Sequence, residues 1–131
     1  MTGRNITVPV EIPMTPFRRM LIDADIDMDI KRAAINTSYM IEQTTKSYED
    51  AIGAHKPSID AGDPQTIDVV KYLAYLSEIP YSQIEKLADT AWKPLMRKDP
   101  QLALDFMAEF QALALKRKEL EDLRAAAEKL V

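Results

Sequence analysis

Residues 99–131 read DPQLALDFMAEFQALALKRKELEDLRAAAEKLV, and this stretch decides the fold class. After Asp99-Pro100 it holds no glycine or proline, and leucine, alanine and charged residues that favour helix dominate it. Asp99 suits the cap of a helix, and proline is well tolerated at the first helical position. The stretch therefore predicts one helix up to Val131, about 45 Å long at 1.5 Å per residue.

Two arrangements are open to this C-terminal helix. Phe106, Phe110 and Leu113 form a broad apolar stripe that suits packing on the chain's own helices. A heptad register puts Glu109 and Lys116 at core d positions, which disfavours a long coiled coil. The apolar side chains near the end of the helix either project towards a partner or fold back on the bundle; they are Leu120, Leu123, Leu130 and Val131.

Three further helices are expected before residue 99, each bounded by glycine or proline. Asp63-Pro64 repeats the start signal of residues 99 and 100, and Pro94 halts or kinks the helix that contains it. The three helices span residues 29–52, 64–78 and 81–91, with a loop at 54–62 after the first and a break at Ile79-Pro80 after the second.

The N-terminal region alternates apolar and polar residues with period two, which is typical of a strand with one buried face. Pro9 cannot donate to a sheet ladder, so it restricts this strand to a sheet edge or to an extended arm. A second alternation, LIDADIDMDI at residues 21–30, could pair with the first as a hairpin. The apolar face of the first strand, and a candidate surface for a partner, is Ile6, Val8, Val10 and Ile12.

Together these patterns predict a mainly α protein of one domain with a single core. About four helices, the last of them long, follow a short N-terminal β-strand, hairpin or extended arm. The arm or hairpin takes residues 1–28 and the helical domain takes residues 29–131.

The composition excludes several kinds of catalytic and metal site. The chain has no cysteine, which excludes thiolate nucleophiles and cysteine-based metal sites, and a single histidine, His55, in a predicted loop. Its net charge is −4, and no basic run is longer than residues 116–118, so binding to nucleic acid is disfavoured. No apolar run could span a bilayer or act as a leader. We expect a cytoplasmic protein that uses no cofactor.

Four aspartates alternate with apolar residues in DADIDMDI, residues 23–30. A calcium loop starting at Asp23 would need glycine at its sixth position and glutamate at its twelfth, where this chain has Met28 and Ala34. On a strand, alternate side chains line one face and do not converge on an ion. We therefore favour an acidic, water-facing edge, with a divalent-metal enzyme as the alternative; the four residues are Asp23, Asp25, Asp27 and Asp29.

Residues 71–92, KYLAYLSEIPYSQIEKLADTAW, loosely follow a helix-turn-helix pattern around the proline break. Glu78 occupies the turn, where glycine is usual, and one lysine faces two acidic residues in the second helix. A DNA-binding regulator is thus a second alternative; its groove-facing residues would be Tyr81, Ser82, Gln83 and Lys86.

The segment YLAYLSEIPYSQIEKLADTAWKPLM, within residues 69–96, resembles small tail assembly chaperones and related assembly proteins of tailed phages. The shared features are two apolar helical turns, a short Ile/Leu-Pro break and an IxxL helix. The long charged helix after residue 99 departs from that family. The resemblance implies a non-enzymatic protein that binds other chains during tail or particle assembly, either in the cytoplasm or within an assembled virion. It transfers no binding residues.

The function expected from the sequence is therefore structural. We expect a non-enzymatic assembly protein, a homo-oligomer or part of a larger assembly, without catalytic, cofactor or metal residues. Its expected contacts are the apolar arm up to Ile12 and the C-terminal helix face of Leu120, Leu123 and Leu130.

Overall fold

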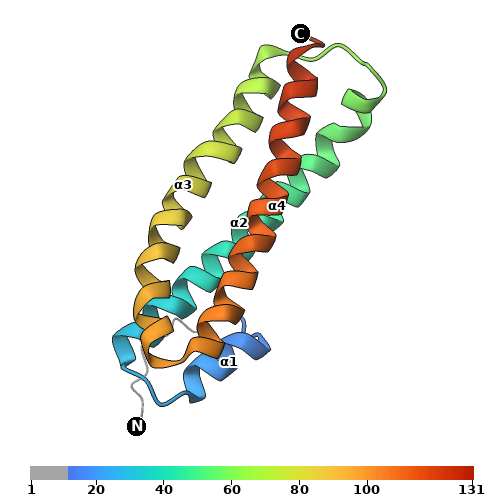
Figure 1. Ribbon diagram of the computed structural model, residues 1–131. Coiled ribbons are helices and arrows are strands. Elements are labelled where there is room, and N and C mark those ends of the chain that lie inside the picture. The colour runs from blue at the N-terminus through green and yellow to red at the C-terminus, as the bar shows by residue number, and fades with distance from the viewer. Residues whose placement is uncertain (1–11) are drawn as a thin grey trace.

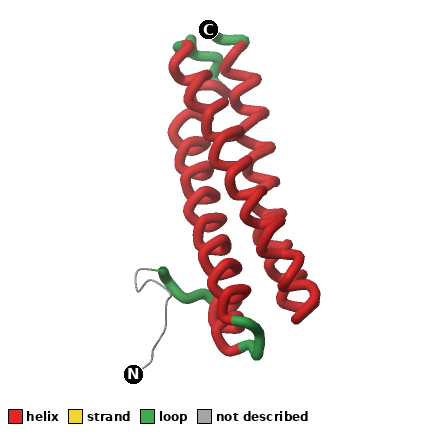
Figure 2. Tube along the Cα trace, turned by 90° about the vertical axis from the view of Figure 1, so that its left-hand side faces the viewer, coloured by secondary structure: helices red, strands yellow, loops and turns green. Residues whose placement is uncertain are grey.

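The computed structural model describes residues 12–131, which form four α-helices. They are α1 (Pro16–Asp23), α2 (Met28–Asp60), α3 (Ile67–Lys98) and α4 (Pro100–Glu128). The three long helices run side by side, up, down and up, and α1 packs on α2 and α4 at the end of the bundle where those two helices begin (Figure 1). The part of the chain that is described contains no strand (Figure 2). The mainly α fold class is therefore confirmed.

The predicted hairpin falls partly outside the described residues, because Ile6, Val8 and Val10 precede residue 12. Ile12 is buried in the core without belonging to a strand. The second alternation, residues 21–30, was wrong as a strand, since it contains the last turn of α1, a short connection and the start of α2 at Met28.

The helix starts follow ordinary capping chemistry. Asp99 accepts a hydrogen bond from the backbone N–H of Leu102 at 3.2 Å and begins α4, which confirms the predicted start. The predicted cap Asp63 was wrong, because α3 begins later. Thr66 caps it instead, accepting from the backbone N–H of Val69 at 3.3 Å.

Helix α2 continues past Gly53 to Asp60, so the predicted loop at residues 54–62 was largely wrong. Pro57 removes one backbone donor in the last turns of α2, and the burial of the Ile59 side chain in the core favours the helix there. The helix ends at Gly62, whose φ of 79° is left-handed, and its N–H donates to the Ile59 carbonyl at 3.0 Å. This is a glycine-terminated helix end of the usual kind.

Helix α3 runs unbroken from Ile67 through Pro80, so the helices predicted at residues 64–78 and 81–91 are parts of one helix instead of two. Pro80 has no N–H, and the carbonyl of Leu76 therefore lacks its donor within the helix. The Tyr48 hydroxyl of α2 donates to that carbonyl at 2.5 Å, and Nε of Arg117 on α4 donates to the next carbonyl, that of Ser77, at 2.7 Å. Both neighbouring helices thus stabilise α3 at its proline. Burial raises the pKa of Tyr48 to about 12, although the nearby Arg117 charge opposes the shift.

The core lies along the common axis of the three long helices. Side chains from all three helices meet there at less than about a tenth of full exposure, and α1 adds Phe17 and Leu21 at its own end. The Phe17 and Phe106 rings are 6.4 Å apart. The largest apolar side chains that are fully enclosed are Tyr48, Phe106, Leu21, Ile35, Leu73, Ile84, Leu95, Leu113 and Leu120. None of the helices in residues 12–131 has the length and apolarity needed to cross a membrane.

Candidate functional site

Helix α3 carries large apolar side chains on its outer surface as well as on its core side. Tyr72, Tyr75 and Ile79 are 49%, 55% and 46% exposed. Their spacing of three and then four residues places them on one side of the helix. The buried residues Leu73, Ser77 and Ile84 belong to the opposite side. We call the surface formed by Tyr72, Tyr75 and Ile79 the α3 face.

The α3 face differs from scattered exposed apolar residues, which are normal on protein surfaces. Its three side chains lie within two helical turns, and the Tyr72 ring also contacts His55 of α2, with ring centroids 6.3 Å apart. Leu104 and Leu115 of α4 are also exposed, but eleven residues of helix, about 16 Å, separate them. The α3 face is therefore a concentrated apolar patch, and the two α4 leucines are isolated.

The sequence contained a signal for this surface that was interpreted otherwise. Residues 71–92 were interpreted as two helices around a turn, so the apolar residues before Pro80 were not considered as one side of a long helix. Once α3 is one helix, its first half is apolar on two opposite sides. A helix that is apolar all round normally has protein on both sides.

The helix-turn-helix interpretation was wrong. A turn between two helices is required for that motif, and α3 is continuous from Ile67 to Lys98. Tyr81, one of the predicted groove-facing residues, is buried against Phe110 of α4, with ring centroids 5.6 Å apart. Ser82, Gln83 and Lys86 are exposed.

The four aspartates of residues 23–29 do not converge. Asp23 ends α1, Asp25 lies in the connection, and Asp27 and Asp29 begin α2; all four are exposed. The intervening Ile22, Ala24 and Ile26 pack against the core, so the predicted alternation of burial is present without a strand. In residues 12–131 no three carboxylates or histidines come close enough to hold a metal ion.

The predicted contact surface on the C-terminal helix is mostly internal. Leu120 and Leu123 are buried among the chain's own helices, so the helix folds back instead of projecting. Leu130 is half-buried against the core, and its carbonyl accepts from the backbone N–H of Gln65 at 2.9 Å. Leu120 and Leu123 can reach a partner only if the bundle opens.

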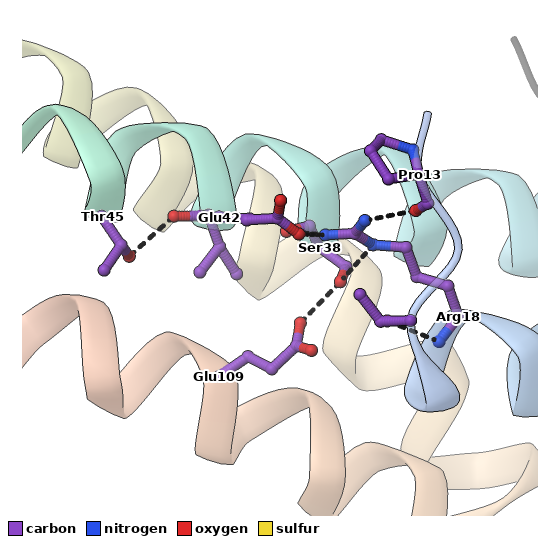
Figure 3. Close-up of polar contacts among 8 residues, drawn as sticks. Pro13, Arg18, Ser38, Glu42, Thr45 and Glu109 are labelled. Atoms are coloured by element: carbon purple, nitrogen blue, oxygen red, sulfur yellow. Dashed lines mark hydrogen bonds and ion pairs between the residues drawn. The ribbon is translucent and has the colours of Figure 1, made fainter. Parts of the chain in front are cut away.

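A polar cluster joins α1 to the bundle (Figure 3). Its centre is Arg18, which is 1% exposed. The guanidinium donates from Nε to Ser38 Oγ at 3.1 Å and from Nη1 to the Pro13 carbonyl at 2.6 Å. Its Nη2 donates to Glu42 at 2.5 Å and to the Ser38 carbonyl at 3.3 Å. Ser38 in turn donates to Glu109 of α4 at 2.6 Å. The cluster lines an open pocket of about 430 Å³ between α2 and α4.

Arg18 is used for structure in this arrangement. Arginine has five N–H donors, and the four hydrogen bonds just described engage both terminal nitrogens and Nε. Little donor capacity is left for an anionic ligand in the pocket. No local pattern predicts the cluster, because Arg18 and Arg19 are adjacent and only the fold distinguishes the buried arginine from the exposed one.

Glu109 is the titratable group that the pocket perturbs. Burial raises its pKa, while the hydrogen bond from Ser38 and the Arg18 charge partly oppose the shift. A carboxyl whose folded pKa is raised binds its proton more tightly in the folded state, so its contribution to stability is lost as pH rises through the folded pKa.

We expect Glu109→Gln to remove this pH dependence, because the amide oxygen still accepts from Ser38 and carries no charge. The variant should match or exceed the wild-type free energy of unfolding at pH 7 and lose that advantage towards pH 4. Urea titrations at both pH values measure this. Glu119→Gln, at an exposed position of α4, is the control. An unchanged difference between Glu109→Gln and wild type at the two pH values would contradict the assignment.

Trp92 is half-buried and packs against the core, and its indole N–H is buried without an acceptor among the described residues. It lines a small apolar pocket of about 240 Å³ with Met107 and Phe110 of α4. This agrees with a core position for the single tryptophan.

No protein-family model, curated protein or solved structure matches the chain. The function proposed below therefore rests on the geometry of the helices.

Proposed function

We propose that this protein is a non-enzymatic assembly subunit that associates with other protein chains, beginning with copies of itself, through the α3 face. One observation carries the proposal. Tyr72, Tyr75 and Ile79 stand together on the side of α3 opposite its buried residues, half-exposed to water. Tyrosine is enriched at protein interfaces, where its ring is buried and its hydroxyl keeps a polar contact.

The size of the α3 face indicates a modest affinity. Fully burying one large apolar side chain contributes about 1.5–3 kcal/mol, and these three begin about half-exposed. A symmetric pair of chains would therefore gain roughly 5–9 kcal/mol from them, against a cost of association of at least about 4 kcal/mol. Flanking contacts are needed for a stable complex, and we expect association in roughly the micromolar to millimolar range.

A role in particle or tail assembly would fit the resemblance of residues 69–96 to tail assembly chaperones. Such proteins work by binding other chains, and the α3 face lies within that segment. On this proposal the principal contact surface is the α3 face, in place of the predicted Leu120, Leu123 and Leu130.

The mass in solution tests the proposal. Light scattering behind a sizing column should give a wild-type mass that rises above the 14.8 kDa monomer over about a hundredfold range of concentration. The variant Tyr72→Gln/Tyr75→Gln/Ile79→Gln should remain monomeric, because glutamine keeps helix propensity and removes the apolar surface.

Leu104→Gln/Leu115→Gln is the matched control on α4, and it should associate like the wild type. A wild-type chain that stays monomeric throughout would refute self-association. A glutamine variant of the α3 face that associates as well as the wild type would show that another surface is responsible.

A further inference from the structure

The α3 face has exposed charges at both ends and along one edge, where Lys71 and Glu78 lie four residues before and three residues after Tyr75. Asp68 lies towards the start of α3 and Lys86 towards its end, on the same side of the helix as Tyr75 and Ile79. Both are exposed, and neither forms an ion pair within residues 12–131. Each lies nine residues from Ser77, since 77 − 68 and 86 − 77 are both nine.

The apolar residues are arranged about the same point. Tyr75 and Ile79 lie two residues on either side of Ser77, and Tyr72 and Ser82 lie five residues on either side. The outer surface of α3 therefore reads, in order, acidic, apolar, polar and basic about one centre. On reversal the acidic end meets the basic end and Tyr75 meets Ile79, while Tyr72 meets Ser82.

We propose that the partner of the α3 face is a second copy of this chain, whose α3 packs antiparallel, with the twofold axis crossing the α3 face between Tyr75 and Ile79, at the height of Ser77 along the helix. This rests on the proposed function and specifies its geometry. Tyr75 of each copy then meets Ile79 of the other, and Asp68 of each meets Lys86 of the other. A twofold interface is self-complementary in this way, because each contact occurs twice.

The charges disfavour the other simple arrangement. In a parallel pair Asp68 would face Asp68 and Lys86 would face Lys86, and like charges repel. Glu78 lies one residue from the proposed axis but at the edge of the face, where its side chain can reach water. The two Asp68–Lys86 contacts supply the flanking interactions that the three apolar side chains require.

Cysteine cross-linking tests the orientation. The chain has no cysteine, so introduced thiols are the only ones present. We would prepare Asp68→Cys and Lys86→Cys separately and treat each with a short bismaleimide, alone and as an equal mixture. The mixed pair keeps one Asp68–Lys86 contact and brings the two thiols together, so it should cross-link to a covalent dimer. Each variant alone should not, because antiparallel packing separates its identical thiols by about 27 Å.

Charge exchange tests the same contacts without a cross-linker. Asp68→Lys and Lys86→Asp should each weaken self-association about tenfold, and their equal mixture should restore it. The double variant Asp68→Lys/Lys86→Asp should also associate like the wild type. Mixing restores opposite charges in either orientation, so the single variants decide it. In a parallel pair each single change would only replace one like-charge contact by another, so weakening by both single changes requires residues 68 and 86 of different copies to be adjacent.

The outcomes separate the two proposals. A monomeric wild type overturns both. If the wild type associates and glutamines on the α3 face abolish this, but Asp68→Cys cross-links alone or the mixture does not cross-link, then the association surface stands and the antiparallel geometry is wrong. Leu115→Cys on α4 is the control and should give no covalent dimer in either case.

Discussion

Replacing Tyr48 by phenylalanine is expected to lower the free energy of unfolding by about 1–3 kcal/mol, because it leaves the Leu76 carbonyl buried without a donor. Pro80 cannot supply the helical hydrogen bond, and the Tyr48 hydroxyl is the group that does so at 2.5 Å. The ring itself is retained, so the packing loss is small. Urea-induced unfolding followed by circular dichroism measures the change.

The Tyr48 hydroxyl should matter only while residue 80 is a proline, and this provides the control. In a Pro80→Ala background the alanine N–H can bond the Leu76 carbonyl within the helix, so Tyr48→Phe should then cost less than about 1 kcal/mol. A Tyr48→Phe penalty that is the same with and without Pro80 would show that the hydroxyl does not compensate for the proline. Tyr39→Phe on the same helix is a matched change at a partly exposed tyrosine.

Replacing Arg18 by methionine is expected to destabilise the protein by about 2–4 kcal/mol and to release α1 from the bundle. Methionine fills a similar volume but donates no hydrogen bond, so the Pro13 carbonyl and the Ser38 hydroxyl lose their donor. Glu42 adds little to the loss, because it is 45% exposed and can be solvated. Hydrogen exchange of α1 amides, together with urea unfolding, measures both effects.

Arg19→Met is the control for this prediction, since Arg19 is the adjacent residue on α1 and is exposed. It should change stability by less than about 0.5 kcal/mol. Equal stability of Arg18→Met and Arg19→Met would mean that the polar cluster does not hold α1. Faster exchange in α1 with no change elsewhere would show local release of that helix.

The long C-terminal helix was predictable because its signals are local. Asp99-Pro100 marks its start, and the absence of glycine and proline afterwards leaves no alternative. The same local reasoning failed at Pro80. A proline inside a helix normally breaks it, and the groups that compensate come from α2 and α4, which no local pattern in α3 reveals.

The candidate contact surfaces, too, were predictable only where a local sequence pattern determines them. The burial alternation around the four aspartates was visible in the sequence, but a helix end and a connection produce it as well as a strand does. The α3 face could be recognised only once α3 was known to be one helix. Leu120 and Leu123 fitted both arrangements of the C-terminal helix, and only tertiary packing decides between them.

The connections between the long helices have a kinetic consequence. Residues 61–66 join α2 to α3, and the single residue Asp99 joins α3 to α4, so each long helix packs on the one that follows it in the chain. Little chain entropy is lost in closing such short loops. Helical bundles typically fold in about microseconds to milliseconds, and we expect this range for a chain whose consecutive long helices are joined by such short connections.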